Sequence, residues 1–296
     1  MKKSSSQVEL LLDAHAATGE SPTWSEREQA LYWIDIEEPA LHRLNPATGV
    51  DESWETPAQI GAFALCRSGA VLVALRTGLA KMTLNDGRFE TLCAPPYNPL
   101  EFRFNEGKCD SLGRFWVGAK HEPLRGYGAT STAARPVGFF TKGRGFRASS
   151  PSAAIANGLA WSPDSRTMYF ADSSLRTIWA YDYDVETANP SAQRVFAQFA
   201  AADGAPDGAA IDREGCYWCA LYGGGRVLRL SPDGRIDREI RLPVSQPTMC
   251  AFGGPDYGTL YITSAAHGVE AEPLAGGVFH CLPGVRGTPP ALFADD

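Results

Sequence analysis

The sequence has no run of about 18 consecutive apolar residues, the length that a membrane-spanning helix needs. We also expect no secretory signal sequence. Lys2 and Lys3 are followed by only a short apolar stretch, which already carries Glu9 and Asp13. We therefore expect a cytoplasmic protein that does not associate with membranes.

Clustered positive charge is equally scarce. The 296 residues contain 27 Lys and Arg against 34 Asp and Glu, for a formal net charge of -7. No segment gathers enough Lys or Arg to form the basic face on which nucleic-acid binding depends. Hydrophobic residues make up 44% of the chain, which excludes disorder as its main state. The composition predicts a globular protein without a nucleic-acid partner.

The seven cysteines lack the even count and regular spacing of a disulfide framework. A reducing cytosol is the simplest setting for such a chain. Cys216 and Cys219 form a C-x-x-C pair, but they fall in an expected strand, where residues three apart point to opposite faces. We favour buried structural thiols over a redox or zinc site.

Three familiar catalytic motifs are missing: the G-x-S-x-G nucleophile turn, the H-E-x-x-H zinc motif and the G-x-x-x-x-G-K-[ST] phosphate loop. The five histidines are not spaced as metal ligands. The glycine run at 223–225 lies between two expected strands, which is typical of a hairpin turn rather than of a phosphate-binding loop.

What the chain does have is 30 Gly, 21 Pro and a short pattern that recurs along its whole length. A turn precedes a strand with a bulky apolar residue, at intervals of 39 to 53 residues. The six bulky residues are Trp33, Leu72, Trp116, Tyr169, Trp218 and Tyr261. Repeats of this length made of about four strands are typical of propeller blades. We predict an all-β, six-bladed β-propeller that forms one domain over residues 1–296. A strand near 8–12 is expected to close the ring against a segment near 291–293.

The repeat also predicts a site. At 11 to 15 residues before each bulky residue, where the innermost strand of a blade should begin, stand Glu20, Gly61, Asn105, Asn157, Asp207 and Gln246. Equivalent ends of innermost strands converge on a central channel. Five of these six side chains carry oxygen and two are carboxylates, which repel one another unless a cation lies between them. Carboxylate and amide oxygens suit a hard divalent ion such as Ca²⁺, Mn²⁺ or Mg²⁺. Asn-Gly and Asp-Gly are also common turn dipeptides, so a purely structural role at these positions is the alternative.

At these positions the sequence resembles the SMP-30/gluconolactonase family, which includes regucalcin and bacterial sugar lactonases. The resemblance extends over nearly the whole chain and is carried by residues 19–24, 103–110, 157–162, 206–208 and 276–279. It implies a six-bladed propeller with one divalent metal ion (Ca, Mn, Mg, Zn or Fe) in its channel. It further implies metal ligation by Glu20, Asn157 and Asp207, and substrate contacts from Arg103 and Asn105.

Two places depart from the family pattern. Glu106 stands where Asp is common, and Gly118-Ala119-Lys120 replaces Gly-Thr-Met. Family members also place an acidic substrate contact just beyond that strand. Glu122 is the nearest candidate for it, and the neighbouring His121 is a second candidate at the rim of the pocket.

Together these features predict metal-dependent hydrolysis of a sugar aldonolactone, either a pentono- or a hexonolactone, to the aldonic acid in a sugar oxidation pathway. Asp207 is the expected catalytic base that takes a proton from the attacking water. The expected partner is the small sugar lactone alone, with the protein a monomer or a weak homo-oligomer. Two alternatives stay open: a metal-dependent esterase or phosphotriesterase of the same propeller family, and a non-catalytic calcium-binding propeller.

Overall fold

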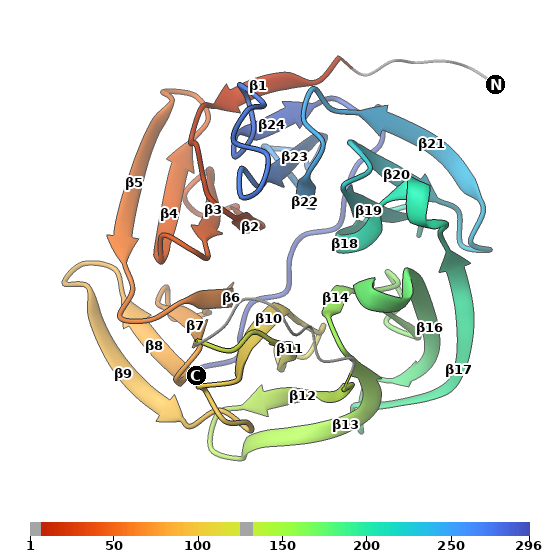
Figure 1. Cartoon of the computed structure of the whole chain (residues 1–296). Coiled ribbons are helices and arrows are strands. Elements are labelled where there is room, and N and C mark those ends of the chain that lie inside the picture. Colours follow the sequence, from red (N-terminus) through yellow and green to blue (C-terminus); the bar gives the residue numbers. More distant parts are fainter. Residues whose placement is uncertain (1–6, 125–132) are drawn as a thin grey trace.

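Short strands separated by turns make up nearly all of the regular structure, as the turn-rich composition predicts (Figure 1). The computed structural model describes residues 7–124 and 133–296, so that Lys2 and Lys3 lie outside the described part. Within that part, 24 strands form six four-stranded antiparallel sheets around a central axis. The prediction of an all-β, six-bladed propeller is confirmed.

Each blade is built from consecutive strands that run from the axis outward. Blade one contains β2 (Gly19–Ser25), β3 (Ala30–Asp35), β4 (Ala40–Asn45) and β5 (Val50–Glu55). Blade two contains β6 (Ile60–Leu65), β7 (Val71–Leu75), β8 (Gly78–Thr83) and β9 (Arg88–Cys93). Blade three contains β10 (Phe102–Cys109), β11 (Phe115–His121), β12 (Arg135–Thr141) and β13 (Gly145–Ala153).

The remaining blades follow the same order. Blade four contains β14 (Ala156–Trp161), β15 (Thr167–Asp172), β16 (Thr177–Asp184) and β17 (Asn189–Gln198). Blade five contains β18 (Ala205–Ile211), β19 (Tyr217–Tyr222), β20 (Arg226–Leu230) and β21 (Ile236–Arg241). Blade six contains β22 (Pro247–Gly253), β23 (Thr259–Ser264) and β24 (Val278–Cys281), and it is completed by β1 (Glu9–Leu12).

Among the described residues, helical structure is limited to the single turns η1 (Ser173–Leu175) and η2 (Ala201–Asp203). In that same part of the chain, no helix has both the length and the apolar character to cross a membrane.

Burial decreases from the second strand of a blade to its outer strand. All six residues of β3 and all five of β7 are buried, because neighbouring blades cover both of their faces. The outer strands β5 and β9 have no buried residue and carry charged side chains toward solvent. The bulky residues of the repeat lie on the second strands, and Trp33, Trp116 and Trp218 are essentially inaccessible.

A buried aspartate joins the innermost strand to the second strand in two blades. In blade three, Asp110 accepts a hydrogen bond from Trp116 Nε1 over 3.0 Å. In blade five, Asp212 accepts the equivalent bond from Trp218 Nε1 over 2.9 Å. Each carboxylate also accepts backbone N–H groups of the intervening turn. The recurring Asp and Trp therefore fix the turn that leads outward from the channel.

The ring is closed by the N-terminal strand, as expected, but on a different partner. β1 pairs with β24, with Glu9 opposite His280 and Leu10 opposite Phe279. The expected pairing with residues 291–293 is wrong, because Phe293 instead bridges Cys66 of blade two. β24 has an unpaired edge for β1 to cover, whereas the last residues lie across the end of the channel (Figure 1). They run from Gly287 beside blade five to blade two.

Candidate functional site

Every innermost strand is interrupted by a bulge at the same place in its blade. The register of the pairing with the second strand shifts after Glu20, around Gly61, at Asn105 and Glu106, after Asn157, at Asp207 and Gly208, and at Thr248. A bulge redirects side chains and is common beside functional sites. The ring of oxygen-bearing residues expected from the repeat thus coincides with six irregular strand segments around the channel.

Two of the six ring positions differ from the others: Gly61 has no side chain, and Gln246 lies outside the bulge. An added Cβ at Gly61 would lie 2.0 Å from the carbonyl oxygen of Phe104, so the backbones of blades two and three approach too closely for a side chain. In blade six the bulge contains Thr248 rather than Gln246, which precedes β22. Thr248 donates its hydroxyl to the carbonyl of Gly19 over 2.5 Å and so supports the strand that carries Glu20.

Asparagine side chains connect blades three, four and five. Asn105 Nδ2 donates to Oδ1 of Asn157 over 2.8 Å and to the carbonyl of Ala156 over 2.9 Å. Asn157 Nδ2 in turn donates to Ser173 Oγ over 2.8 Å, and Ser173 donates to the carbonyl of Pro206 over 2.6 Å. The chain of bonds therefore ends beside Asp207. Ser173 was missed in the sequence, because it lies in η1 outside the repeat pattern.

The two ring carboxylates are destabilised in their charged form. Glu20 is 7% exposed, and burial raises its pKa to about 7 although its Oε2 accepts the backbone N–H of Ser21 over 2.7 Å. Asp207 is partly buried, and its pKa is raised well above the usual range by desolvation and by the charges of Glu20 and Glu106. Carboxylates that repel one another in this way are stabilised by a bound cation.

The donors at the ring fit a hard divalent ion. Among the described residues, no three His, Cys, Asp or Glu side chains are grouped closely enough to hold a metal. The candidate set is of another kind: two carboxylates, Glu20 and Asp207, and the amide oxygen of Asn157. All three are oxygen donors, which suits Ca²⁺, Mg²⁺ or Mn²⁺ better than a soft metal. The hydrogen bond from Asn105 fixes the orientation of the Asn157 amide.

Glu106 supports the site from behind. Its Oε2 accepts the N–H of Gly158 over 2.5 Å, and its Oε1 accepts the N–H of Leu159 over 2.9 Å. It thereby holds the backbone that follows Asn157. Burial raises the pKa of Glu106 to about 8. Lys108 Nζ lies 3.9 Å from Oε1, and it donates to the carbonyl of Ala209.

Gly158 must be glycine at this point in the strand. Its φ is +63°, and an added Cβ would lie 2.4 Å from the hydroxyl oxygen of Tyr217. Tyr217 donates that hydroxyl to the carbonyl of Gly158 over 2.7 Å. Glu106 and Tyr217 therefore hold opposite sides of the same peptide segment.

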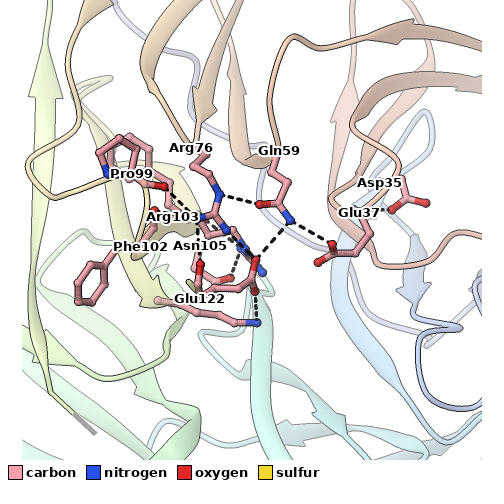
Figure 2. A network of polar contacts seen from close by, with 11 residues as sticks. Asp35, Glu37, Gln59, Arg76, Pro99, Phe102, Arg103, Asn105 and Glu122 are labelled. Carbon is pink, nitrogen blue, oxygen red and sulfur yellow. Dashed lines mark hydrogen bonds and ion pairs between the residues drawn. The ribbon is translucent and has the colours of Figure 1, made fainter. Parts of the chain in front are cut away.

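A cluster of charged side chains lies next to the ring, on blades two and three (Figure 2). Glu122 Oε1 lies 2.8 Å from Arg103 Nε and 3.1 Å from Arg76 Nη2, and Glu122 Oε2 lies 2.9 Å from Lys120 Nζ. Burial alone would raise the pKa of Glu122, but the charges of Arg103 and Lys120 lower it to about 2. Arg103 Nη1 also donates to Asn105 Oδ1 over 2.8 Å, which connects this cluster to the ring.

The structure brings Glu122 into this cluster but places His121 elsewhere. His121 pairs with Phe102 across β10 and β11, and the two rings meet edge to face with centroids 5.0 Å apart. Successive strand residues point to opposite faces, so His121 lies on the side of β11 away from Lys120 and Glu122. Arg76 and Gln59, by contrast, were missed in the sequence. Gln59 Oε1 accepts from Arg76 Nε over 2.7 Å (Figure 2).

Below the ring the channel continues into a cavity of about 220 Å³. Its walls come from the residues that follow the ring positions, among them Ser21, Lys108 and Met249. The C-terminal segment 288–292 covers its other end. Glu20, Asn157 and Asp207 are not part of this lining.

The chain matches known proteins over most of its length. The family model described as SMP-30/Gluconolactonase/LRE-like region matches residues 18–266. A 6-deoxy-6-sulfogluconolactonase of Pseudomonas putida is 40% identical over 93% of this chain and 94% of its own. An L-arabinolactonase of Azospirillum brasilense is 39% identical over 97% and 96% of the two chains.

A solved structure is similar over the same extent. The calcium-binding protein regucalcin of Agrobacterium tumefaciens superposes with a TM-score of 0.90 at 27% identity, over 97% of both chains. The family match includes the innermost strand of every blade, from β2 to β22. The chain therefore belongs to the SMP-30/gluconolactonase family.

Proposed function

We propose that this protein hydrolyses a sugar aldonolactone to the aldonic acid with the help of one divalent metal ion. The observation that carries the proposal is the pair of channel carboxylates, Glu20 and Asp207, with raised pKa values beside the amide of Asn157. Two relatives at 39–40% identity are named as lactonases, which bears out the expectation of a hydrolase.

Glu20, Asn157 and Asp207 are the residues that would hold the metal ion. When bound, such an ion polarises the lactone carbonyl and stabilises the negative charge that develops on its oxygen. The charge of a divalent ion would be balanced by the two carboxylates. Three protein ligands leave room for further ligands at the ion.

We assign the role of general base to Asp207, since the other ring carboxylate, Glu20, already accepts the backbone N–H of Ser21. Asp207 takes a proton from the attacking water as the water oxygen bonds to the carbonyl carbon. The bond from that carbon to the ring oxygen then breaks, and the proton passes to the ring oxygen. Atoms and charge balance, since water and lactone give the hydroxy acid.

Arg103 and Asn105 are proposed to orient the sugar. Arg103 Nε and Nη1 are engaged by Glu122 and Asn105, which fixes the plane of the guanidinium group. Its Nη2 is the group that we assign to a sugar hydroxyl. Side chains immobilised in this way lose little further entropy when substrate binds.

The names of the relatives indicate the class of substrate. One is named for a sulfonated gluconolactone and the other for L-arabinolactone, so hexono- and pentonolactones both occur as substrates among relatives with similar identity. We propose an aldonolactone as the substrate and the cytoplasm as the compartment. All seven cysteines are free thiols, which supports a reducing compartment.

The test is acid release from xylono-, arabinono-, galactono- and gluconolactone by protein stripped with a chelator. Ca²⁺, Mn²⁺, Mg²⁺, Zn²⁺ or Fe²⁺ is then added back singly. We expect hydrolysis of at least one lactone to be lost on stripping and restored by a divalent ion. No hydrolysis of any lactone, with metal binding intact, would contradict the proposal and favour a calcium-binding propeller.

A further inference from the structure

The charged cluster beside the ring contains more positive charge than the protein neutralises. Arg76, Arg103 and Lys120 all contact the single carboxylate of Glu122, at 3.1, 2.8 and 2.9 Å. Glu37 lies one step further away, joined to the cluster through Gln59, whose Nε2 donates to it over 3.0 Å. An excess of positive charge therefore remains at the cluster. The carboxylates of the neighbouring ring do not offset it when a divalent ion balances their charge.

Lys120 is more exposed than the other charged side chains that contact Glu122. It lies directly opposite Arg103 in the pairing of β10 with β11, so the two side chains share one face of the sheet. Asn105, which belongs to the ring, accepts a hydrogen bond from Arg103 Nη1 over 2.8 Å and so connects this face to the ring. The charges of Lys120 and Arg103 both favour the ionised forms of Glu20 and Asp207, although burial leaves the pKa values of these two carboxyl groups raised.

Exposure separates Lys120 from the two arginines. The Lys120 side chain is 31% exposed, whereas those of Arg76 and Arg103 are 6% and 3% exposed. The arginines hold Glu122 through Oε1, and Lys120 reaches the other oxygen. Lys120 can thus turn toward a ligand without leaving the buried carboxylate unpaired.

Two like charges placed directly opposite each other across a strand pair destabilise a sheet. A neutral sugar lactone has no charged group that would interact with Lys120 beside the two arginines. An anionic group on the substrate would be stabilised by it.

We infer that Lys120, backed by Arg76 and Arg103, is a specificity-determining residue that binds an anionic substituent on the lactone, at the end of the sugar away from the ester carbonyl. This inference rests on the proposed lactonase function. The chemistry that the cluster recognises is a sulfonate, a phosphate ester or a carboxylate, since an ammonium group bonds to oxyanions of all three kinds.

The test compares pairs of lactones that differ only at carbon 6. Glucono-1,5-lactone is the neutral member, and its 6-phosphate, its 6-deoxy-6-sulfonate and the corresponding glucarolactone are the anionic members. Wild type, Lys120→Met, Lys120→Arg and the control Arg88→Gln are assayed with the same saturating metal. Arg88 is exposed on the outer strand β9 and provides a matched loss of one positive charge.

We expect wild type to favour at least one anionic lactone about tenfold or more in kcat/KM. Lys120→Met should lose that preference, mainly because KM for the anionic lactone rises. Its kcat/KM for the neutral lactone should change less than about threefold. Lys120→Arg should keep most of the preference for the anionic lactone, and Arg88→Gln should keep all of it. The ranking of the three anionic lactones identifies the oxyanion. A wild-type preference for the neutral lactone, or equal losses on both members of a pair in Lys120→Met, would overturn the inference.

A binding measurement keeps this inference separate from the proposed function. Calorimetric titration compares gluconate with 6-phosphogluconate and 6-deoxy-6-sulfogluconate, without any catalytic step. If no lactone is hydrolysed, the lactonase proposal fails. Tighter binding of the anionic members by wild type, lost in Lys120→Met, still supports the subsite, and equal binding overturns it.

Discussion

Asn105 donates a hydrogen bond from Nδ2 to Oδ1 of Asn157 over 2.8 Å, and so joins the third and fourth blades inside the channel. The opposite side of the Asn157 amide donates to Ser173. With both ends of the amide engaged, its orientation is set before any ligand arrives. A ligand that is already oriented loses less freedom on binding a metal.

Replacing Asn105 by alanine should therefore weaken metal binding although we do not assign Asn105 as a ligand. We expect a loss of about 10- to 100-fold in affinity, the usual effect of removing a group that orients a ligand. Calorimetric titration of the stripped protein with Ca²⁺ or Mn²⁺ measures it. Asn189→Ala, on the exposed outer strand β17, is the control. Unchanged affinity in Asn105→Ala would refute this role.

The metal-free protein should lose stability as pH rises from about 4.5 to 7. Glu20 has its pKa raised from 4.5 to about 7, so between these values the folded state binds more protons than the unfolded state. The free energy of unfolding should fall by about 1–3 kcal/mol across this range. Urea denaturation in chelator at pH 5 and pH 7.5 measures the change. Glu20→Gln should reduce the dependence without abolishing it, because the pKa values of Glu106 and Asp207 are raised as well. A slope that is the same in both proteins would exclude a contribution from Glu20.

Glu106→Gln should both destabilise the fold and weaken the site. Each of the two oxygens of Glu106 accepts a backbone N–H group, whereas an amide presents only one oxygen and turns an NH₂ group toward the second donor. We expect a loss of about 1–3 kcal/mol in unfolding free energy. Metal affinity should drop with it, because Asn157 precedes the backbone that Glu106 holds. Glu90→Gln on the exposed strand β9 is the matched control. Wild-type stability in Glu106→Gln would rule out this support.

Glu122 should stabilise the protein at neutral pH and cease to do so in acid. Its pKa is lowered to about 2, so its contribution is complete above about 4.5 and is lost as pH falls from there toward 2. We expect Glu122→Gln to be about 1–3 kcal/mol less stable than wild type at pH 6. The gap should narrow between pH 4.5 and 2.5 in urea denaturation. A gap that stays constant over this range would show that the charge of Glu122 is not responsible.

The repeat made much of the fold and of the ring predictable. Bulky residues such as Trp33 and Trp116 recur because each second strand is covered on both faces, and this leaves a period in the sequence. The oxygen-bearing ring follows from the same period, since equivalent positions of a closed ring converge on its axis.

Other residues of the site do not recur with the repeat, so the sequence pattern does not reveal them. Arg76 reaches Glu122 from the neighbouring blade two, 46 residues away, through a contact that only the packing of one blade on another creates. Glu106 stands out in the sequence only because Asp is common at its position in the family, and its hydrogen bonds to the backbone of Gly158 and Leu159 have no local signature. The pairing of residues 291–293 was wrong for the same reason: two short apolar segments do not reveal which sheet edge each will meet.

The most direct test of the central claim is the lactone hydrolysis rate of Asp207→Asn at saturating metal. The variant keeps an oxygen donor at the ring but cannot accept a proton at neutral pH. If Asp207 is the base, kcat on the best aldonolactone should fall by about 10²- to 10⁴-fold, with bound metal verified in the same sample. A kcat equal to that of wild type, with metal bound, would contradict the assignment of this channel carboxylate as the catalytic base.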